Sequence, residues 1–375
     1  MIKVANVVFN GFTNDSRVLK ESISLSKNGY QVEVIAHGDK GLIDDEEVEN
    51  FRVRRFSYLD RTTTLGKFQK LKAYMNYMKE SIHYCKNFDI LHCNDLITLP
   101  IGFVIKKFYN NNIKIVYDAH EYETEMNGLS QTSKKISKVL EKFLIKYVDT
   151  MITVSAGIAD EYVKLYNIEK PSLILNTPPH KNVIKKDIFR EVFDITTEQR
   201  IFLYQGSLSK GRGIEILVET FKSLDSSTVI VFMGYGQLAN FLKLSAHENE
   251  NIYFHDAMKP DVLLDYTSSA DFGISTIEDT CLSYHYCLPN KMFEYIMAEV
   301  PVIVSNLPEM KRIVLDNAVG LVVDENSVEG LKKAIIESTH LNKNELNQNL
   351  KSLKKIYNWE EQEKVLLRIY KELEG

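Results

Sequence analysis

The sequence has little cysteine, a single tryptophan and no long apolar run. Its four cysteines form no C-x-x-C pair, and no group of histidines and cysteines has the spacing of zinc ligands. We therefore expect reduced thiols in a cytosolic protein and no disulfide framework. No stretch approaches the roughly 18 to 20 apolar residues that a membrane span needs, and the first residues lack the pattern of a signal peptide.

The chain also has no excess of positive charge. It carries 46 Lys and Arg against 51 Asp and Glu, for a net charge of −5, whereas a nucleic-acid-binding domain is usually strongly basic. We therefore expect no nucleic-acid partner. The apolar and charged fractions, 44% and 26%, are ordinary for a globular protein. A length of 375 residues suits two domains of similar size better than one core.

What the sequence does have is a regular alternation of short apolar runs with stretches of helical periodicity. In the first half, the helical stretch 16–28 ends before Gly29, a residue that favours a helix stop. Such strand–helix alternation is typical of a parallel sheet covered by helices on both faces. The apolar runs predict strands over 2–9, 31–36, 51–56, 89–92, 113–117, 150–154 and 172–175.

The alternation breaks after residue 175. The segment 176–180 (Asn-Thr-Pro-Pro-His) continues neither a strand nor an ordinary helix, and the polar stretch up to residue 200 indicates a connection between domains. We therefore predict two doubly wound α/β domains, residues 1–180 and 190–357, followed by a last helix that Asn358 caps. The strands predicted in the second half cover 201–204, 228–233, 252–254, 272–275, 302–304 and 320–323.

Ligands of open parallel sheets bind beyond the carboxyl ends of the strands, so the loops after strands are the candidate sites. After the first strand, Gly11 permits a tight turn, and the following helix offers free N–H groups to an acceptor or an anion. The loop 10–17 is not a G-x-G-x-x-G motif. A plain turn before an N-capped helix explains it equally well.

A histidine, His120, follows the predicted strand 113–117 and has acidic neighbours. A histidine in that place can donate a hydrogen bond to a hydroxyl or to a developing charge, although a lone histidine is also commonly structural. His92 has the same placement. There, capping of the next helix by Asn94 or Asp95 is an alternative explanation of the polar residues.

The second half opens with a strand that runs into a glycine-rich, cationic loop and then into a helix, over 204–213 (Tyr-Gln-Gly-Ser-Leu-Ser-Lys-Gly-Arg-Gly). Glycines such as Gly206 let the backbone approach a phosphate, and Lys210 or Arg212 supplies positive charge. The pattern is not a P-loop. A merely solvated loop is the alternative.

The most informative segment is 288–295 (Leu-Pro-Asn-Lys-Met-Phe-Glu-Tyr). Pro289 suits a helix start, and Lys291 and Glu294 lie three residues apart on one side of the first turn. A carboxylate there can accept hydrogen bonds from a ribose diol, and a cation can meet a diphosphate. A surface salt bridge between the two side chains explains the pair, but not its place after a strand and a long loop.

Taken together, these segments resemble the retaining GT-B glycosyltransferases of family 4, the group 1 transferases. The resemblance spans nearly the whole chain in the family's order. It implies a GT-B fold, in which two Rossmann-like domains face an interdomain cleft and the closing helix, 358–375, crosses back to the first domain. The segments that carry it are 12–21, 117–121, 204–213, 288–295, 301–303 and the helix that begins near Trp359.

The resemblance also implies a reaction. A sugar passes from a nucleoside-diphosphate sugar, held mainly by the second domain, to a glycan or lipid-linked acceptor, with retention of configuration and without a metal or other cofactor. By position, Arg212 helped by Lys210 contacts the diphosphate, Glu294 binds the ribose, and His120 lies by the donor sugar. The other substrate-binding positions are Gly11, Asn14, Asp15, Gly206, Tyr286, Asn290 and Lys291.

One departure from the family pattern concerns the donor sugar. The family commonly shows Glu, seven residues, then Glu. Here Glu294 fills the second place, but Tyr286 stands in the first, and Glu278 is too far upstream to replace it by register. Because the first acid usually reaches the donor sugar, the identity of that sugar stays open.

Two helical stretches of the first domain are rich in lysine and apolar residues, and a basic amphipathic surface can contact anionic lipid. We therefore hypothesise a cytoplasmic protein with peripheral contact at the inner face of the membrane, although ordinary solvated helix faces explain the pattern equally well. The residues are Lys67, Phe68, Lys70, Leu71, Lys72, Tyr74, Tyr77 and Lys79, and then Lys134, Lys135, Ile136, Lys138, Val139, Lys142, Phe143 and Lys146.

Two other functions fit the sequence. A hydrolysing nucleotide-sugar epimerase shares the two-domain design. A non-catalytic nucleotide-sugar-binding partner of a transferase is supported by the missing first acid alone.

Overall fold

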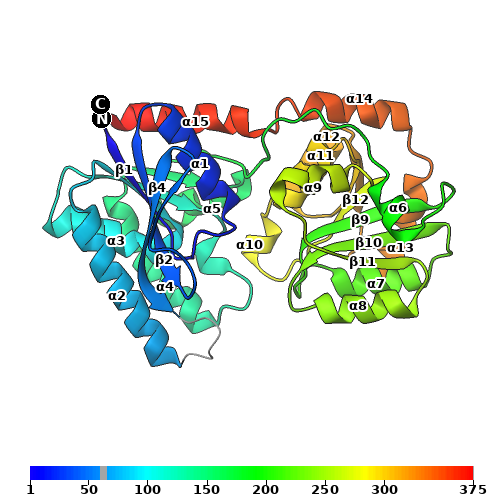
Figure 1. The fold of residues 1–375 in the computed structure, drawn as a ribbon, viewed down its shortest axis with the longest axis horizontal. Helices are drawn as coiled ribbons and strands as arrows, with labels where there is room; N and C mark the ends of the chain where they lie inside the picture. Colours follow the sequence, from blue (N-terminus) through cyan, green and yellow to red (C-terminus); the bar gives the residue numbers. More distant parts are fainter. Residues whose placement is uncertain (60–65, 375) are drawn as a thin grey trace. The chain divides into compact units, whose positions relative to one another are not determined.

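The computed structural model describes residues 1–59 and 66–374, without the side chains of residues 57–59 and Lys67. The chain forms two α/β units, each a sheet flanked by helices (Figure 1). Unit 1 comprises Met1–Ile174 and Gln362–Gly375, and unit 2 comprises Leu175–Glu361.

The chain passes from unit 1 to unit 2 after Ile174 and back to unit 1 after Glu361, a few residues away from the predicted domain limits of 180 and 357. The start of the last helix belongs to unit 2, because Trp359 N donates to the carbonyl of Pro178 at 2.9 Å and the Glu360 carboxylate accepts from His180 N at 2.9 Å. Asn358 caps this helix as expected, since its Oδ1 accepts from Glu361 N at 3.0 Å.

The sheet of unit 1 has eight strands in the order β3-β4-β2-β1-β5-β6-β7-β8. All neighbouring strands are parallel except β3 and β4. The strands are β1 (Lys3–Val7), β2 (Gln31–Asp39), β3 (Asp45–Val48), β4 (Phe51–Leu59), β5 (Ile90–Asn94), β6 (Lys114–Ala119), β7 (Thr150–Thr153) and β8 (Ser172–Leu173).

The antiparallel strand β3 is an addition to the parallel sheet that the sequence predicted, and it was not among the predicted strands. Its sequence, Asp-Glu-Glu-Val, has no apolar run that would mark a strand. Ion pairs across the strands hold it instead, with Asp45 2.6 Å from Arg54 and Glu46 2.7 Å from Arg55. Opposite charges on facing strands favour such pairing, which an apolar pattern does not reveal.

Helix α1 of unit 1 begins and ends where the sequence supplies caps. Asp15 accepts from Val18 N at the start of α1, and Gly29 follows that helix with a φ of +91°. The last helix, α15, packs on unit 1 through Tyr370, whose ring lies 5.3 Å from that of Tyr30. The helices are α1 (Ser16–Lys27), α2 (Lys67–Cys85), α3 (Asp95–Phe108), α4 (Gln131–Leu144), α5 (Ala156–Tyr166) and α15 (Trp359–Glu374), with short 3₁₀ turns at Glu123–Glu125 and Ile145–Tyr147.

The sheet of unit 2 is entirely parallel, in the order β11-β10-β9-β12-β13-β14. Side chains alternate across it: Ile201 and Leu203 enter one apolar core, and Phe202 enters the other. Burial on both faces explains why these strands read as continuous apolar runs. The strands are β9 (Arg200–Ser207), β10 (Thr228–Tyr235), β11 (Ile252–Asp256), β12 (Phe272–Ser275), β13 (Val302–Ser305) and β14 (Gly320–Val323).

Helices cover both faces of this second sheet. One of them, α6, lies inside the polar stretch that the sequence indicated only as a connection. The helices are α6 (Ile188–Phe193), α7 (Ile214–Lys222), α8 (Ala239–Glu248), α9 (Pro260–Thr267), α10 (Leu282–His285), α11 (Asn290–Met297), α12 (Pro308–Asp316), α13 (Val328–Ser338) and α14 (Lys343–Leu353).

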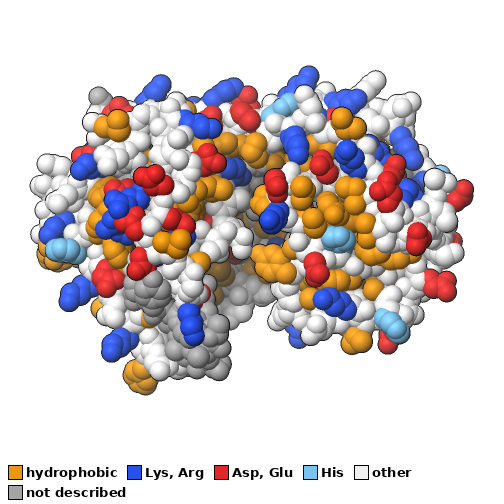
Figure 2. Space-filling view, viewed as in Figure 1, with side chains coloured by type: hydrophobic (Ala, Val, Ile, Leu, Met, Phe, Trp, Pro, Cys, Tyr) orange, Lys and Arg blue, Asp and Glu red, His pale blue; other side chains and the backbone are white. Residues whose placement is uncertain are grey.

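Each sheet has one point where the strand order reverses, between β1 and β5 in unit 1 and between β9 and β12 in unit 2. Ligands of doubly wound sheets bind at such points, outside the carboxyl ends of the strands. Basic and acidic side chains are interspersed on the face shown in Figure 2. Over residues 1–59 and 66–374, no helix is long and apolar enough to cross a membrane.

Candidate functional site

The glycine-rich loop of unit 2 begins at the carboxyl end of β9, at the reversal of strand order. Three of its residues, Gly206, Gly211 and Gly213, have φ values of +108°, +81° and +69°. A Cβ on Gly213 would lie 2.7 Å from the hydroxyl oxygen of Thr276. Only glycine fits this conformation and this space without strain.

Two residues that follow β12 hold the loop in place. Thr276 Oγ1 donates to the carbonyl of Arg212 at 3.2 Å, and Glu278 N donates to the carbonyl of Gly211 at 3.0 Å. The Glu278 carboxylate accepts from Gly213 N at 3.4 Å. Glu278 therefore lies against the cationic loop, a position that its spacing from Glu294 did not reveal.

The carboxylate of Glu294 lies beside the same loop, on α11. Gln205 Nε2 donates to it at 2.5 Å, and Gln205 Oε1 accepts from Thr267 Oγ1 at 2.8 Å. Gln205 is buried at the end of β9, so this chain of hydrogen bonds sets the position of the carboxylate. Half-buried Glu294 can accept hydrogen bonds from a diol, as its sequence position suggested.

Lys291 occupies an unusual place for a lysine. Its side chain is only 8% exposed, and its Nζ lies 3.4 Å from the centre of the Tyr204 ring with no hydrogen-bond acceptor among the described residues. The alternative interpretation from the sequence, a surface salt bridge between Lys291 and Glu294, is therefore wrong. Burial, and then the nearby Arg212 guanidinium, lower the pKa of Lys291 well below its usual value, against a smaller raising effect of Glu294.

Two opposing energies act on the Lys291 ammonium. A cation over an aromatic ring gains about 2 kcal/mol when it is desolvated. Removing an ammonium from water costs several kcal/mol even after relaxation. The cost exceeds the gain, so the charged form of Lys291 is less favourable in this site than in water.

The other predicted residues of unit 2 differ in burial. The Arg212 guanidinium lies 4.8 Å from the centre of the Tyr284 ring and is half-buried. Lys210 and Asn290 are exposed. Tyr286 is half-buried, with its ring against that of His285 at 4.7 Å.

Chemically, the unit 2 site combines a glycine-rich loop, two basic side chains (Arg212 and Lys291) and a carboxylate at the point where ligands of such sheets bind. The loop and cations suit an anion such as a diphosphate. The carboxylate suits hydroxyl donors. All of these groups belong to one unit.

Unit 1 has a second polar cluster at its own reversal of strand order. Arg17, on α1, forms two hydrogen bonds with the Asp118 carboxylate, each 2.8 Å long, and a third with the carbonyl of Ile174 at 2.7 Å. Burial alone would raise the pKa of Asp118, but Arg17 and His120 hold it well below its usual value. Asp118 is therefore a buried anion.

His120 lies at the edge of this cluster. Its Nε2 is 3.3 Å from Asp118 Oδ2 and 3.0 Å from Asn94 Oδ1. Burial alone would lower the pKa of His120, but Asp95 and Asp118 raise it to about 10. A protonated His120 can donate hydrogen bonds, and its role beside the donor sugar stays a prediction. Asn94 stands at the N-cap position of α3, as one alternative expected, but its side chain makes no capping hydrogen bond, and its amide donates instead to Val7 O at 3.0 Å.

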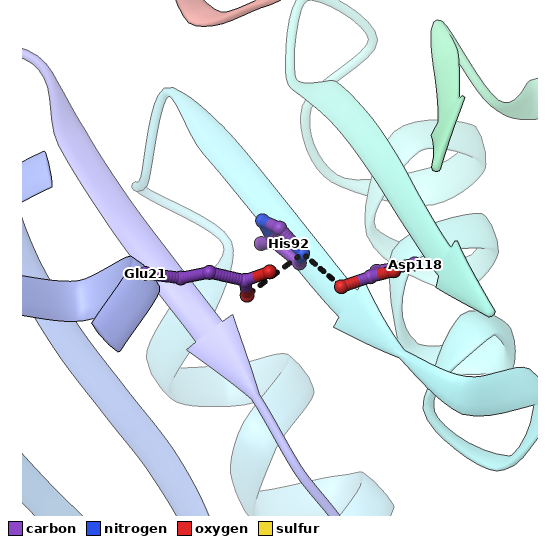
Figure 3. A group of neighbouring side chains, drawn as sticks. All are labelled: Glu21, His92 and Asp118. Carbon is purple, nitrogen blue, oxygen red and sulfur yellow. Dashed lines mark ion pairs between the residues drawn. The ribbon is translucent and has the colours of Figure 1, made fainter. Parts of the chain in front are cut away.

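Glu21, His92 and Asp118 form a fully buried group with the spacing of metal ligands (Figure 3). His92 Nε2 lies 3.7 Å from Glu21 and 3.5 Å from Asp118. Arg17 Nε also lies between the carboxylates, 3.2 Å from Glu21 and 2.8 Å from Asp118. Burial raises the pKa of Glu21 to about 7, although Arg17 opposes the shift. Arg17 supplies the positive charge that a metal would bring, so we interpret the group as a structural ion-pair network.

The Gly11 loop is tightly braced. The carbonyl of Gly11 accepts from Arg55 Nε at 2.9 Å, and a Cβ on Gly11 would lie 2.9 Å from Leu42. Asp15 caps α1 and also accepts from Asn10 at 2.9 Å, which accords with the plainer reading of a turn before a capped helix. Asn14 is exposed.

Two family sequence models match the two units in turn. The model described as Glycosyltransferase Family 4 matches residues 17–176, and the model described as Glycosyl transferases group 1 matches residues 185–356. The chain belongs to glycosyltransferase family 4. The second match contains the whole unit 2 site, and the first contains Arg17, Asp118 and His120 but not the Gly11 loop.

Known proteins resemble this family 4 chain over most of its length. The chitobiosyldiphosphodolichol beta-mannosyltransferase of Kluyveromyces lactis is 21% identical over 367 residues, which cover 85% of this chain and 78% of that protein. Sucrose-phosphate synthase from Thermosynechococcus elongatus matches with a TM-score of 0.82 and 16% identity, over 100% of this chain and 99% of that one. HepE of Anabaena in complex with UDP-glucose matches with a TM-score of 0.75 and 12% identity, over 99% and 100%.

These likenesses establish the GT-B fold for the family 4 chain, as its sequence predicted. The signals for Gly206, Arg212 and Glu294 were already present in the sequence, since each follows a strand. Gln205 and Glu278 were missed as site residues. Gln205 belongs to a strand, and Glu278 does not fit the spacing of the family's two acids. Neither residue therefore has a local sequence pattern that indicates a role in the site.

Proposed function

We propose that this family 4 chain transfers a sugar from a nucleoside-diphosphate sugar to a glycan or lipid-linked acceptor, with retention of configuration and without a metal. The observation that supports the donor class is the grouping of Arg212, Lys291 and Glu294 around the glycine-rich loop. In this proposal the cations and the loop N–H groups hold the diphosphate, and Glu294 holds the ribose. The complex of HepE with UDP-glucose supports the same donor class.

The reaction follows from where charge develops. As the bond to the sugar breaks, the leaving diphosphate gains negative charge, and Arg212 and Lys291 stabilise it electrostatically. We assign protonated His120 to the donor sugar and propose that the acceptor attacks the face that the diphosphate leaves, which retains the configuration. Because cations of the chain stabilise the leaving group, the reaction needs no divalent ion.

A thermal-shift panel tests the donor site. The protein is heated with UDP, GDP, ADP, CMP or dTDP, each with and without EDTA. A nucleotide at 100 times its dissociation constant stabilises the folded state by about 2.7 kcal/mol. We expect one nucleoside diphosphate to raise the melting temperature equally with and without EDTA. No shift with any nucleotide contradicts the donor site, and a shift that EDTA abolishes contradicts metal independence.

Product analysis separates transfer from the two other functions. A transferase consumes the donor when an acceptor is present, and the anomeric configuration of the product, measured by NMR, shows retention or inversion. Conversion of the donor sugar to an epimer without any acceptor would identify a hydrolysing epimerase. Binding without turnover, in the presence of a broad set of acceptors, would identify a non-catalytic partner.

The surface of α4 favours a lipid-linked acceptor. Ile136 and Val139 are 63% and 72% exposed, and Leu140 and Phe143 are exposed on the same side of the helix. Lys135, Lys142 and Lys146 are exposed along one edge of this apolar stripe. We propose that this face contacts anionic lipid at a membrane surface. The K. lactis relative, by its name, acts on a dolichol-linked substrate.

Vesicle sedimentation tests the α4 face. We expect binding to vesicles of phosphatidylcholine with phosphatidylglycerol, and weaker binding to phosphatidylcholine alone or at high salt. Val139→Glu should weaken binding to the vesicles about tenfold. It removes an apolar group that would be buried in the lipid, and it adds a negative charge that the anionic lipid repels. The matched control is Leu244→Glu, at an equally exposed apolar residue of α8. Equal loss from both variants, or no binding, contradicts the proposal and favours ordinary solvated faces.

A further inference from the structure

The amine of Lys291 is enclosed by groups from three segments. The ring of Tyr204, on β9, lies against the amine, and Arg212 of the glycine-rich loop adds like charge. Cys287 and Glu294, which are close to Lys291 in the sequence, also act on the amine electrostatically. Of these, Glu294 is already bonded to Gln205. The Nζ itself has no hydrogen-bond partner among the residues that the structure describes.

Gly206 leaves space beside this side chain. A Cβ there would lie 3.8 Å from Lys291 Cε, and Gly206 has a φ of +108°. Gly206 is exposed whereas Lys291 is buried, so the loop that would receive an anion is next to a polar group with unused hydrogen-bonding capacity. An unpaired buried amine of this kind is costly unless a ligand completes its contacts.

We propose that Lys291 takes up a proton from solvent when the diphosphate of the donor binds, so that nucleotide binding and protonation are one coupled event. The inference rests on the proposed function of the site. The proton forms an N–H bond to the amine, the product is an ammonium, and Arg212 stays protonated throughout. The empty site thereby avoids a buried ammonium next to the half-buried Arg212 guanidinium, and the occupied site has two cations for the two phosphates.

The direction of the pKa shift agrees with this geometry. Burial and Arg212 lower the pKa of Lys291 well below its usual value in the empty site. A diphosphate opposes both effects, because it brings negative charge and hydrogen-bond acceptors. Between the pKa of Lys291 in the empty site and its higher pKa in the occupied site, nucleotide affinity should therefore fall by up to about tenfold for each unit of rising pH.

Isothermal titration calorimetry with UDP and, separately, GDP tests the coupling at pH 8.0, where the phosphates of both are fully ionised. The titration is run in Tris and in HEPES, two buffers that contain no phosphate and whose ionisation enthalpies differ widely. Proton uptake then appears as a difference between the two observed enthalpies. For the wild type we expect about one proton taken up per nucleotide bound.

Two variants isolate Lys291 from other titrating groups. Lys291→Arg keeps a charge that does not titrate, so it should still bind the nucleotide but take up no proton. Lys291→Met, similar in size and neutral, should bind more weakly and also take up no proton. Circular dichroism and a thermal melt show whether each variant is folded, and one folded variant is enough for the test.

The outcomes separate this inference from the function on which it rests. Binding of UDP or GDP to the wild type with the same enthalpy in both buffers overturns the coupling and leaves the diphosphate site in place. Unchanged proton uptake in either folded variant also overturns it. Failure of UDP and GDP, and of ADP and dTDP titrated in the same way, to bind the wild type overturns the proposed function, and this inference with it.

Discussion

Arg17 and Asp118, which lie 101 residues apart in the chain, form a two-point ion pair in the interior of unit 1. The Arg17 side chain is 3% exposed and that of Asp118 is fully buried. The pair links α1 to β6 and fixes the anion against which His120 lies. The pair therefore contributes both to the stability of unit 1 and to the position of His120, a candidate catalytic residue.

Arg17→Met should destabilise the protein by about 3–5 kcal/mol, because it leaves a buried carboxylate without its partner. Urea denaturation followed by circular dichroism measures the loss. The control is Lys333→Met, which removes the exposed ion pair with Asp324 and should leave the midpoint unchanged. A change in Arg17→Met as small as that of the control would show that Asp118 is satisfied without the guanidinium.

The protonation of His120 predicts a pH dependence of stability. Its pKa is raised to about 10 in the folded state from about 6.5 when unfolded. The stabilisation is thus fully present below about pH 6.5 and is lost as the pH rises through about 10. One proton gives a slope of at most about 1.4 kcal/mol per pH unit, and partial exposure of the ring reduces it.

Urea denaturation at pH 7, 8 and 9 checks this slope. We expect the free energy of unfolding to fall with pH in the wild type and to fall less steeply in His120→Gln, which does not titrate. His180→Gln, at an exposed histidine, is the control and should keep the slope of the wild type. Parallel curves for the wild type and His120→Gln would mean that His120 is neutral in the folded protein.

Glu294→Ala should lose most transfer while the fold survives, because it removes an acceptor of charge-assisted hydrogen bonds worth about 1.5–3 kcal/mol each. This corresponds to roughly 10- to 100-fold weaker nucleotide binding. Thermal melts with and without nucleotide, together with a transfer assay, measure both effects. The control is Glu329→Ala, an exposed acid in the first turn of α13. A folded Glu294→Ala with full activity would refute its assignment.

Gly213→Ala should disturb the cationic loop itself. A Cβ there meets Thr276 at 2.7 Å and stands on a φ of +69°, so we expect a loss of about 1–3 kcal/mol and weaker nucleotide binding. Gly128→Ala is the matched control, because Gly128 also has a positive φ, +83°, but has no atom within 4 Å of the added Cβ. It should lose a little stability and bind nucleotide normally. Equal binding by the two variants would argue that the loop does not hold the nucleotide.

Much of the fold was predictable because its signals are local. Each strand of the second sheet is an apolar run between helical stretches, and Asp15, Gly29 and Asn358 mark helix ends through short-range hydrogen bonds or backbone conformation. Strand β3 escaped prediction because it is held by charge rather than by apolar burial.

The sequence by itself determined the two doubly wound units, the glycine-rich loop of Gly206 and Arg212, and the helix α11 that carries Glu294. Periodicity and strand ends follow from the order of consecutive residues. Only the tertiary structure decided that Lys291 is buried over Tyr204 instead of paired at the surface, and that His92 bonds to Tyr370, 278 residues away, at 2.8 Å. The physical reason is that burial, and with it the state of a titratable group, depends on which distant elements pack around the side chain. No local spacing contains that information.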